Sequence, residues 1–192
     1  GEPTLMGLDF FRRAVGLAET LKPPAVRLQH TIQTNGTLLD DRWAQFFAEK
    51  GFLVGLSLDG PRRLHDAFRL DKQGSPTFDR VMAGLEVLGR HVVDVNVLCT
   101  VNAANEAYPT EVYSFLRDGC GVRYLQLIPI VERVGDRVSP QSVTSEGWGR
   151  FLIEVFDEWV GRDVGEVFVV NFDAALAKWV GLPGGMCIFD ET

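Results

Sequence analysis

Basic residues are few in this sequence, and nowhere do they gather into a run. The chain carries 19 Lys and Arg against 26 Asp and Glu, so its formal net charge is -7. A surface that binds nucleic acid through phosphates needs a patch of Lys and Arg, which this sequence does not supply. We therefore expect no nucleic-acid partner.

Long apolar runs are also missing. A membrane-spanning helix needs roughly 18 or more consecutive apolar residues, and no stretch of the chain approaches that length. The first residues do not show the charged and then apolar pattern of a secretory signal. These two absences predict a soluble, cytoplasmic protein without a membrane partner.

Cysteine is scarce as well. The three cysteines, Cys99, Cys120 and Cys187, are odd in number and far apart, which does not suggest a disulfide framework and fits a reducing compartment. No two of them have a spacing that would hold an iron–sulfur cluster. We expect Cys99 and Cys120 to be small buried residues of the core.

The chain does have enough apolar material for a core, because 46% of its 192 residues are hydrophobic. Strand patterns alternate with helical ones, and one further helix, ending at Lys22, comes first. The predicted strands span residues 25–34, 52–58, 93–101, 123–130 and 167–170. Such alternation predicts parallel strands with crossover helices. Five strands cannot close an eight-stranded barrel, so an incomplete barrel or a doubly wound sheet is expected.

Two of the connections are unusually long. The segments 59–76 and 131–143 both read as loops, and both exceed the roughly 4 to 6 residues of an ordinary connection. The chain also begins on Gly1 without an initiator Met and enters a helical pattern almost at once. We expect a further segment to precede it, so that an N-terminal strand is missing from the sheet.

Polar, glycine-bearing turns follow the first two predicted strands. Gln33-Thr34-Asn35-Gly36 ends the first strand, and Ser57-Leu58-Asp59-Gly60-Pro61 ends the second. Each motif alone could be only a turn, because Asn and Gly tolerate a positive φ. A parallel sheet, however, gathers the carboxyl ends of its strands at one edge, where α/β proteins bind their ligands. The two motifs together predict a ligand site at that edge.

A third motif, Gly1-Glu2-Pro3-Thr4, stands where a loop would follow a preceding strand. It also fits a plain helix N-terminus, with an acidic residue and a proline in the first turn. These three motifs, His65-Asp66 with Arg69, and Asn96-Val97-Leu98-Cys99 together resemble the radical S-adenosylmethionine enzymes. More narrowly, they resemble the anaerobic sulfatase-maturating enzymes, which carry a C-terminal domain (SPASM) for auxiliary iron–sulfur clusters.

This resemblance covers essentially the whole chain. It continues through Tyr124–Pro129, Asn171-Phe172-Asp173 and Cys187–Thr192. It implies that residues 1–181 form a partial, TIM-like parallel β/α barrel lacking its N-terminal strands. Residues 182–192 would begin the auxiliary-cluster domain.

The resemblance also implies roles for individual residues at a cofactor site. Glu2 would hold the amino group of S-adenosylmethionine, since a carboxylate suits an ammonium. Ser57 would contact the methionyl or ribosyl end of the cofactor, and Asp59 would shape the turn beside it. Arg80, or in second place Arg69, would pair with the cofactor carboxylate, because a guanidinium binds carboxylates with two hydrogen bonds. Leu125 would contact the adenine.

The same resemblance places the substrate beside this cofactor site. Gln33, Thr34 and Asn35 would line the pocket on the substrate side. His65-Asp66 invites interpretation as a catalytic dyad, but adjacent side chains generally point different ways. The family uses this loop mainly structurally, so we do not expect His65 to act as a base.

The family's defining Cys-x3-Cys-x2-Cys motif, which binds a 4Fe-4S cluster, is absent from this sequence. Cys99 and Cys120 cannot replace it. Cys187 resembles the first ligand of an auxiliary 4Fe-4S cluster, a role that would hold only in a full-length protein. The ligands of the clusters would therefore lie mostly outside this chain.

The function that the resemblance implies is oxidation of a Cys or Ser of a sulfatase to formylglycine by radical chemistry. The partners would be the sulfatase polypeptide and a reductant such as flavodoxin or ferredoxin, and the chain alone would be inactive. Another peptide-modifying enzyme of the same superfamily, such as a thioether-forming maturase, is an alternative. A binding module without redox chemistry is another. A phosphate-binding barrel enzyme would need a glycine-rich phosphate loop, which we do not find.

Overall fold

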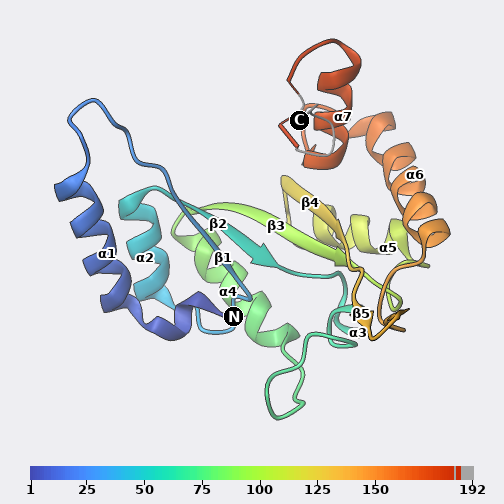
Figure 1. The fold of residues 1–192 in the computed structure, drawn as a ribbon, viewed down its shortest axis with the longest axis horizontal. Helices are drawn as coiled ribbons and strands as arrows, with labels where there is room; N and C mark the ends of the chain where they lie inside the picture. Colours follow the sequence, from blue (N-terminus) through green and yellow to red (C-terminus); the bar gives the residue numbers. More distant parts are fainter. Residues whose placement is uncertain (184, 187–192) are drawn as a thin grey trace.

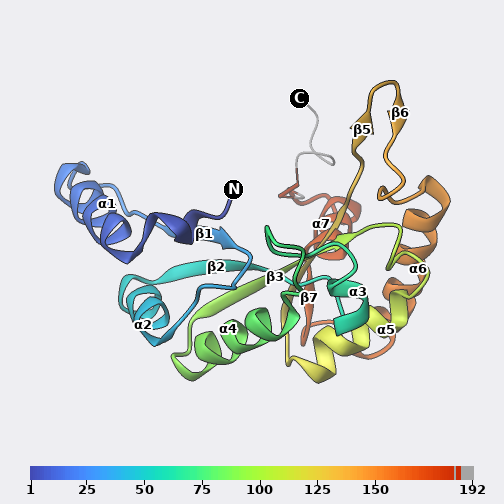
Figure 2. The same cartoon turned by 90° about the horizontal axis from the view of Figure 1, so that it is seen from below.

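The computed structural model describes residues 1–183 and 185–186. Its centre is a five-stranded parallel sheet with the strand order β1-β2-β3-β4-β7, of which Figure 1 labels the first four strands and Figure 2 labels β7. The strands are β1 (His30–Thr34), β2 (Phe52–Ser57), β3 (Asp94–Val101), β4 (Tyr124–Pro129) and β7 (Phe168–Val169). The order follows the chain without the reversal that defines a doubly wound sheet. Of the two predicted architectures, the sheet is therefore the incomplete barrel.

Helices connect these strands, as the alternation of patterns predicts. They are η1 (Pro3–Met6), α1 (Leu8–Leu21), α2 (Asp41–Lys50), α3 (Arg62–His65), α4 (Phe78–Arg90), α5 (Pro109–Ser114), η2 (Phe115–Gly119), α6 (Ser145–Arg162) and α7 (Val170–Trp179). Figure 2 shows α2, α4 and α5 lying along the same face of the sheet. None of the helices in the described part of the chain has both the length and the apolar character needed to cross a membrane.

The core lies between the sheet and these helices. Val54, Leu56, Val97 and Cys99 are fully buried there, on alternate positions of the two central strands. Because successive strand residues point to opposite faces, Ser57 points to the other face, which it shares with Gln33, Asn96 and Gln126 of the neighbouring strands. The sheet thus has one face sealed by helices and one face that carries polar groups.

The structure differs from the sequence prediction in several places. The segment 59–76, predicted as loop, contains the short helix α3. The first strand starts at His30 rather than Ala25, because His30 is the first residue that has a partner on β2, Phe52. The segment 131–143, predicted as loop, contains an antiparallel hairpin of β5 (Arg133–Val134) and β6 (Arg137–Val138). Helix α7 starts at Val170 instead of Asp173. The predicted domain boundary after residue 181 stays a prediction.

Two glycines of α4 allow a matched test of how closely this helix packs. A Cβ at Gly84 would lie 2.5 Å from the carbonyl oxygen of Gly36, whereas a Cβ at Gly89 would meet nothing within 4 Å. We expect Gly84→Ala to lower the free energy of unfolding by about 1–3 kcal/mol through overpacking. Gly89→Ala should raise it by up to about 1 kcal/mol, because Ala is the better helix former. Urea unfolding measures both, and equal effects would contradict the close packing.

Candidate functional site

A cavity of about 390 Å³ lies at the carboxyl ends of β1 and β2. It is lined by Gly1, Glu2, Gln33, Thr34, Asn35, Ser57 and Arg69. The three motifs singled out in the sequence are thus brought together at one edge of the sheet. Six of the residues predicted for the cofactor and substrate pocket line this one cavity, with Arg69, the second candidate for the cofactor carboxylate, among them.

Glu2 is the most heavily bonded of these residues. Its Oε1 accepts hydrogen bonds from the Thr4 amide (3.0 Å), the Thr4 hydroxyl (2.6 Å) and the Thr34 hydroxyl (2.7 Å). Its Oε2 accepts one from the Asn35 amide at 2.7 Å. The carboxylate therefore joins the N-terminal segment to the end of β1, and it presents a fixed negative charge to the cavity.

The ionisation of Glu2 follows from these bonds. Burial would raise the pKa of Glu2, but the hydrogen bonds from Thr4, Asn35 and Thr34 outweigh burial and hold the pKa below its ordinary value of 4.5. The bonds thus stabilise the fold fully above pH 4.5 and lose that contribution as the pH falls through the lowered pKa. We expect the NMR signal of the Asn35 amide to shift with a midpoint below pH 4.5. A midpoint at or above that value would contradict this assignment.

Arg69 enters the cavity from the long segment between β2 and α4. Its Nε donates to Asp59 Oδ2 at 2.6 Å, and its Nη2 donates to Asp59 Oδ1 at 3.0 Å. Asp59, only 2% exposed, also accepts a hydrogen bond from the Thr100 amide at 2.8 Å. Asp59 thus anchors Arg69 to the end of β3 and does not itself line the cavity.

Thr100 is a residue that the sequence reasoning missed. Its position follows from the register of the sheet, because Ser57 pairs with Leu98 and the Leu58 amide donates to the Leu98 carbonyl, which brings Asp59 beside Thr100. The amide of Thr100 therefore meets the carboxylate of Asp59. This contact can be predicted only once β2 and β3 are known to be neighbouring strands.

Two of the predicted cofactor residues lie away from the cavity. Arg80 is on the outer surface of α4, where its Nη2 donates to Asp71 Oδ2 at 2.9 Å. Leu125 is 1% exposed and belongs to the core between the sheet and the helices, on the face opposite Ser57. The structure therefore brings Arg69, and not Arg80, to the cavity wall. Contact of either residue with a cofactor stays a prediction.

The described cysteines do not form a site for an iron–sulfur cluster. Cys99 is buried in the core and Cys120 is partly buried, and burial raises the pKa of Cys99 well above normal and that of Cys120 to about 11. Both side chains are thus held as neutral thiols, whereas cluster ligands are thiolates. Within residues 1–183 and 185–186, His, Cys, Asp and Glu form no group of three or more that could hold a metal ion. The predicted ligand Cys187 lies outside the described residues.

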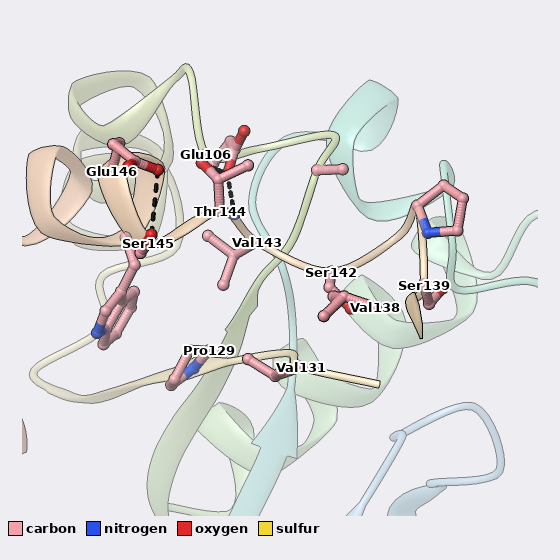
Figure 3. Close-up of a pocket in the computed structure, with 13 residues that line it drawn as sticks. Glu106, Pro129, Val131, Val138, Ser139, Ser142, Val143, Thr144, Ser145 and Glu146 are labelled. Carbon is pink, nitrogen blue, oxygen red and sulfur yellow. Dashed lines mark hydrogen bonds between the residues drawn. The ribbon is translucent and has the colours of Figure 1, made fainter. Parts of the chain in front are cut away.

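A larger cavity, of about 770 Å³, opens at the ends of β3 and β4 on the same edge of the sheet (Figure 3). Its walls are mainly apolar, with Pro129, Val131, Val138, Val143 and Trp148 among them. The two carboxylates in its wall accept hydrogen bonds from residues close to them in the structure. Glu106 accepts from the amide and the hydroxyl of Thr144, and Glu146 accepts from the hydroxyl of Ser145, so both support the start of α6.

Comparison with known proteins tests the resemblance seen in the sequence. No protein-family model matches the chain. The serine-type anaerobic sulfatase-maturating enzyme of Bacteroides thetaiotaomicron is 38% identical over 203 residues, which cover 97% of this chain and 49% of that protein. The cysteine-type enzyme of Clostridium novyi is 35% identical over 161 residues, 83% of this chain and 43% of that protein. The relatives that are 35–38% identical to this chain are anaerobic sulfatase-maturating enzymes.

A solved structure of such a maturase, anSMEcpe with bound AdoMet, has the same fold. It matches with a TM-score of 0.88 and 32% identity, covering 97% of this chain and 50% of that one. Another structure of the maturase holds AdoMet and the Cp18Cys peptide. These likenesses confirm the predicted family resemblance and the partial barrel. The chain spans about half the length of the curated maturases it matches.

Proposed function

We propose that this chain is the central part of a radical S-adenosylmethionine enzyme that oxidises a Cys or Ser of a sulfatase to formylglycine. The cavity between Glu2, Ser57 and Arg69 supports the proposal most strongly. It presents a fixed carboxylate and a guanidinium at the edge of a parallel sheet, and the maturase with a similar fold binds AdoMet. The amino-acid end of S-adenosylmethionine carries an ammonium and a carboxylate, the two complementary charges.

In this proposal each cavity residue has a defined task. Glu2 accepts hydrogen bonds from the ammonium of the cofactor, and Ser57 contacts its methionyl or ribosyl part. Arg69 binds the carboxylate of the cofactor, because it lines the cavity while Arg80 is bound to Asp71 on the surface. Gln33, Thr34 and Asn35 lie at the side from which a sulfatase peptide would enter.

When bound, S-adenosylmethionine supplies the radical that removes a β-hydrogen from the target side chain. The described residues offer no ligand set for the 4Fe-4S cluster that must reduce the cofactor, so this chain alone should be inactive. Apart from Cys187, the cluster ligands, the electron acceptors and the contact with a flavodoxin or ferredoxin would lie in other parts of the full-length protein. The widely separated cysteines fit a reducing cytoplasm as its compartment.

The test uses the full-length protein that contains this chain, reconstituted anaerobically with iron and sulfide. The substrates are two sulfatase-derived peptides that differ only in having Cys or Ser at the target position. We expect 5′-deoxyadenosine and a formylglycine peptide, identified by mass spectrometry, from at least one of them. Cleavage of S-adenosylmethionine with a thioether product instead would favour another maturase. No cleavage at all would favour a binding module.

A further inference from the structure

The segment from Asp59 to Thr77 is closed into a ring of hydrogen bonds around a buried histidine. His65, at 0% exposure, accepts from the Asp59 amide at its Nδ1 (3.3 Å) and contacts the Thr77 hydroxyl with its Nε2 (3.1 Å). The Thr77 hydroxyl in turn donates to the carbonyl oxygen of Arg69 at 2.6 Å. The guanidinium of Arg69 returns to the Asp59 carboxylate and completes the ring.

Counting protons fixes the state of His65 in this ring. A hydroxyl has a single proton, and the Thr77 hydroxyl donates this proton to the backbone carbonyl of Arg69. Towards Nε2 of His65 the hydroxyl can therefore only accept a hydrogen bond. Nε2 therefore carries the proton of His65, and Nδ1 is the free acceptor for the Asp59 amide. A second proton, on Nδ1, would face that amide and break the ring. Only the neutral imidazole protonated on Nε2 satisfies every contact.

The charges around His65 agree with this neutral state. Burial lowers the pKa of His65, and the positive charge of Arg69 lowers it further, while the carboxylates of Asp59 and Asp66 oppose these effects. The edge of the His65 ring packs against Phe78, with centroids 5.8 Å apart.

Asp66 secures the same threonine from its backbone side. Its Oδ1 accepts from the amides of Thr77 (3.0 Å) and Phe78 (2.9 Å) at the start of α4. His65 and Asp66 thus both bind Thr77, one at its hydroxyl and the other at its amide. His65 and Asp66, which look like a catalytic dyad in the sequence, therefore hold Thr77 in place by hydrogen bonds to its side chain and its backbone.

Arg69 gains a fixed geometry from this clamp. Its carbonyl is held by Thr77, and its Nε and Nη2 are held by Asp59, with Nη2 also 3.3 Å from the Thr100 hydroxyl. Its Nη1 makes no hydrogen bond to another residue of the part of the chain that the structure describes. One edge of the guanidinium is therefore fixed, and the remaining donors are left for a ligand in the cavity.

We propose that His65 and Thr77 are positioning residues, which preset the Arg69 guanidinium to receive the carboxylate of the cofactor. This proposal rests on the proposed function. Neither residue lines the cavity, so both act only through Arg69. Their removal should weaken cofactor binding without removing a direct contact, because less of the binding geometry is organised in advance.

The test compares Thr77→Val, which has no hydroxyl, with Thr77→Ser, which keeps it. Calorimetry with S-adenosylmethionine on the reconstituted full-length protein should show a Kd raised at least fivefold for Thr77→Val. Thr77→Ser should stay within about twofold of the wild type. His65→Phe keeps the packing against Phe78 but loses both ring contacts, and it should match Thr77→Val. It tests the ring independently should Thr77→Val fail to fold.

A double-mutant cycle separates positioning from general loss of structure. If Thr77 acts only through Arg69, then Arg69→Gln with Thr77→Val should bind no more weakly than Arg69→Gln alone. Arg63→Gln, on the same segment but paired with Glu111 on the surface, is the matched control and should leave Kd unchanged. If the increases in Kd caused by Arg69→Gln and by Thr77→Val multiply in the double variant, the positioning role is overturned and the proposed function is not. A Thr77→Val protein with wild-type Kd would have the same meaning. A wild-type protein that does not bind S-adenosylmethionine would overturn the proposed function with it.

Discussion

Glu2→Gln is expected to lower the rate of S-adenosylmethionine cleavage by the full-length protein about 100-fold. One backbone amide donates to each oxygen of the Glu2 carboxylate, from Thr4 to Oε1 and from Asn35 to Oε2. Whichever way the Gln amide is turned, its NH2 group must face one of these N–H donors. The variant therefore loses a charge-assisted hydrogen bond and the charge that would face the ammonium.

The measurement is the rate of 5′-deoxyadenosine formation, and 100-fold corresponds to about 2.7 kcal/mol. Glu19→Gln is the control, because Glu19 is an exposed residue of α1 that pairs with Lys22. It should react at the wild-type rate. A Glu2→Gln protein as active as this control would remove Glu2 from the cofactor site.

Asp59→Ala is expected to have the largest effect on stability. The change leaves the guanidinium of Arg69, whose side chain is 24% exposed, without its two carboxylate bonds and also unpairs the Thr100 amide. Breaking a buried ion pair from one side costs about 3–5 kcal/mol. Because this pair is partly exposed, we expect Asp59→Ala to lower the free energy of unfolding by about 3 kcal/mol, which corresponds to a decrease in Tm of about 6–12 °C.

Thermal unfolding followed by circular dichroism checks this prediction. Asp79→Ala is the matched control, because it removes another Asp–Arg pair, with Arg62, that lies on the surface. The control should leave Tm unchanged within error. Equal Tm values for the two variants would mean that the Asp59–Arg69 pair does not hold the segment in place.

Much of the fold can be predicted from the sequence, because apolar periodicity reports which residues face the core. It locates all five strands of the parallel sheet. It fails at the start of β1, where Ala25–Gln29 alternate in polarity but have no partner strand, since β2 begins only after Gly51. It also misses the β5–β6 hairpin, although Gly135-Asp136 between two Arg-Val pairs is a turn signal.

The candidate site, like the fold, can be predicted from the sequence only in part. Glu2, Gln33–Asn35 and Ser57 can be predicted to meet, because parallel strands place their carboxyl ends on one edge. The choice between Arg69 and Arg80 cannot be made from sequence. It depends on the path of the segment after β2, which is fixed by side-chain bonds of His65 and Asp66 to Thr77. Spacing along the chain does not encode such bonds.

The sheet order has a consequence for how the protein is made. Within the parallel sheet, each strand pairs with the strand of that sheet that precedes it in the chain. The cavity and the residues that hold it come no later in the chain than Asn105, whose side-chain amide donates to the carbonyl oxygens of Asp59 and Thr100. Domains acquire structure from the N-terminal side as the chain leaves the ribosome. The cofactor cradle can therefore be assembled while β4, β7 and everything after them are still being translated. Substitutions in β4, β7 and the segments after them should therefore leave the formation of this site unaffected, whereas substitutions near Glu2 or Asp59 should disturb it from the start.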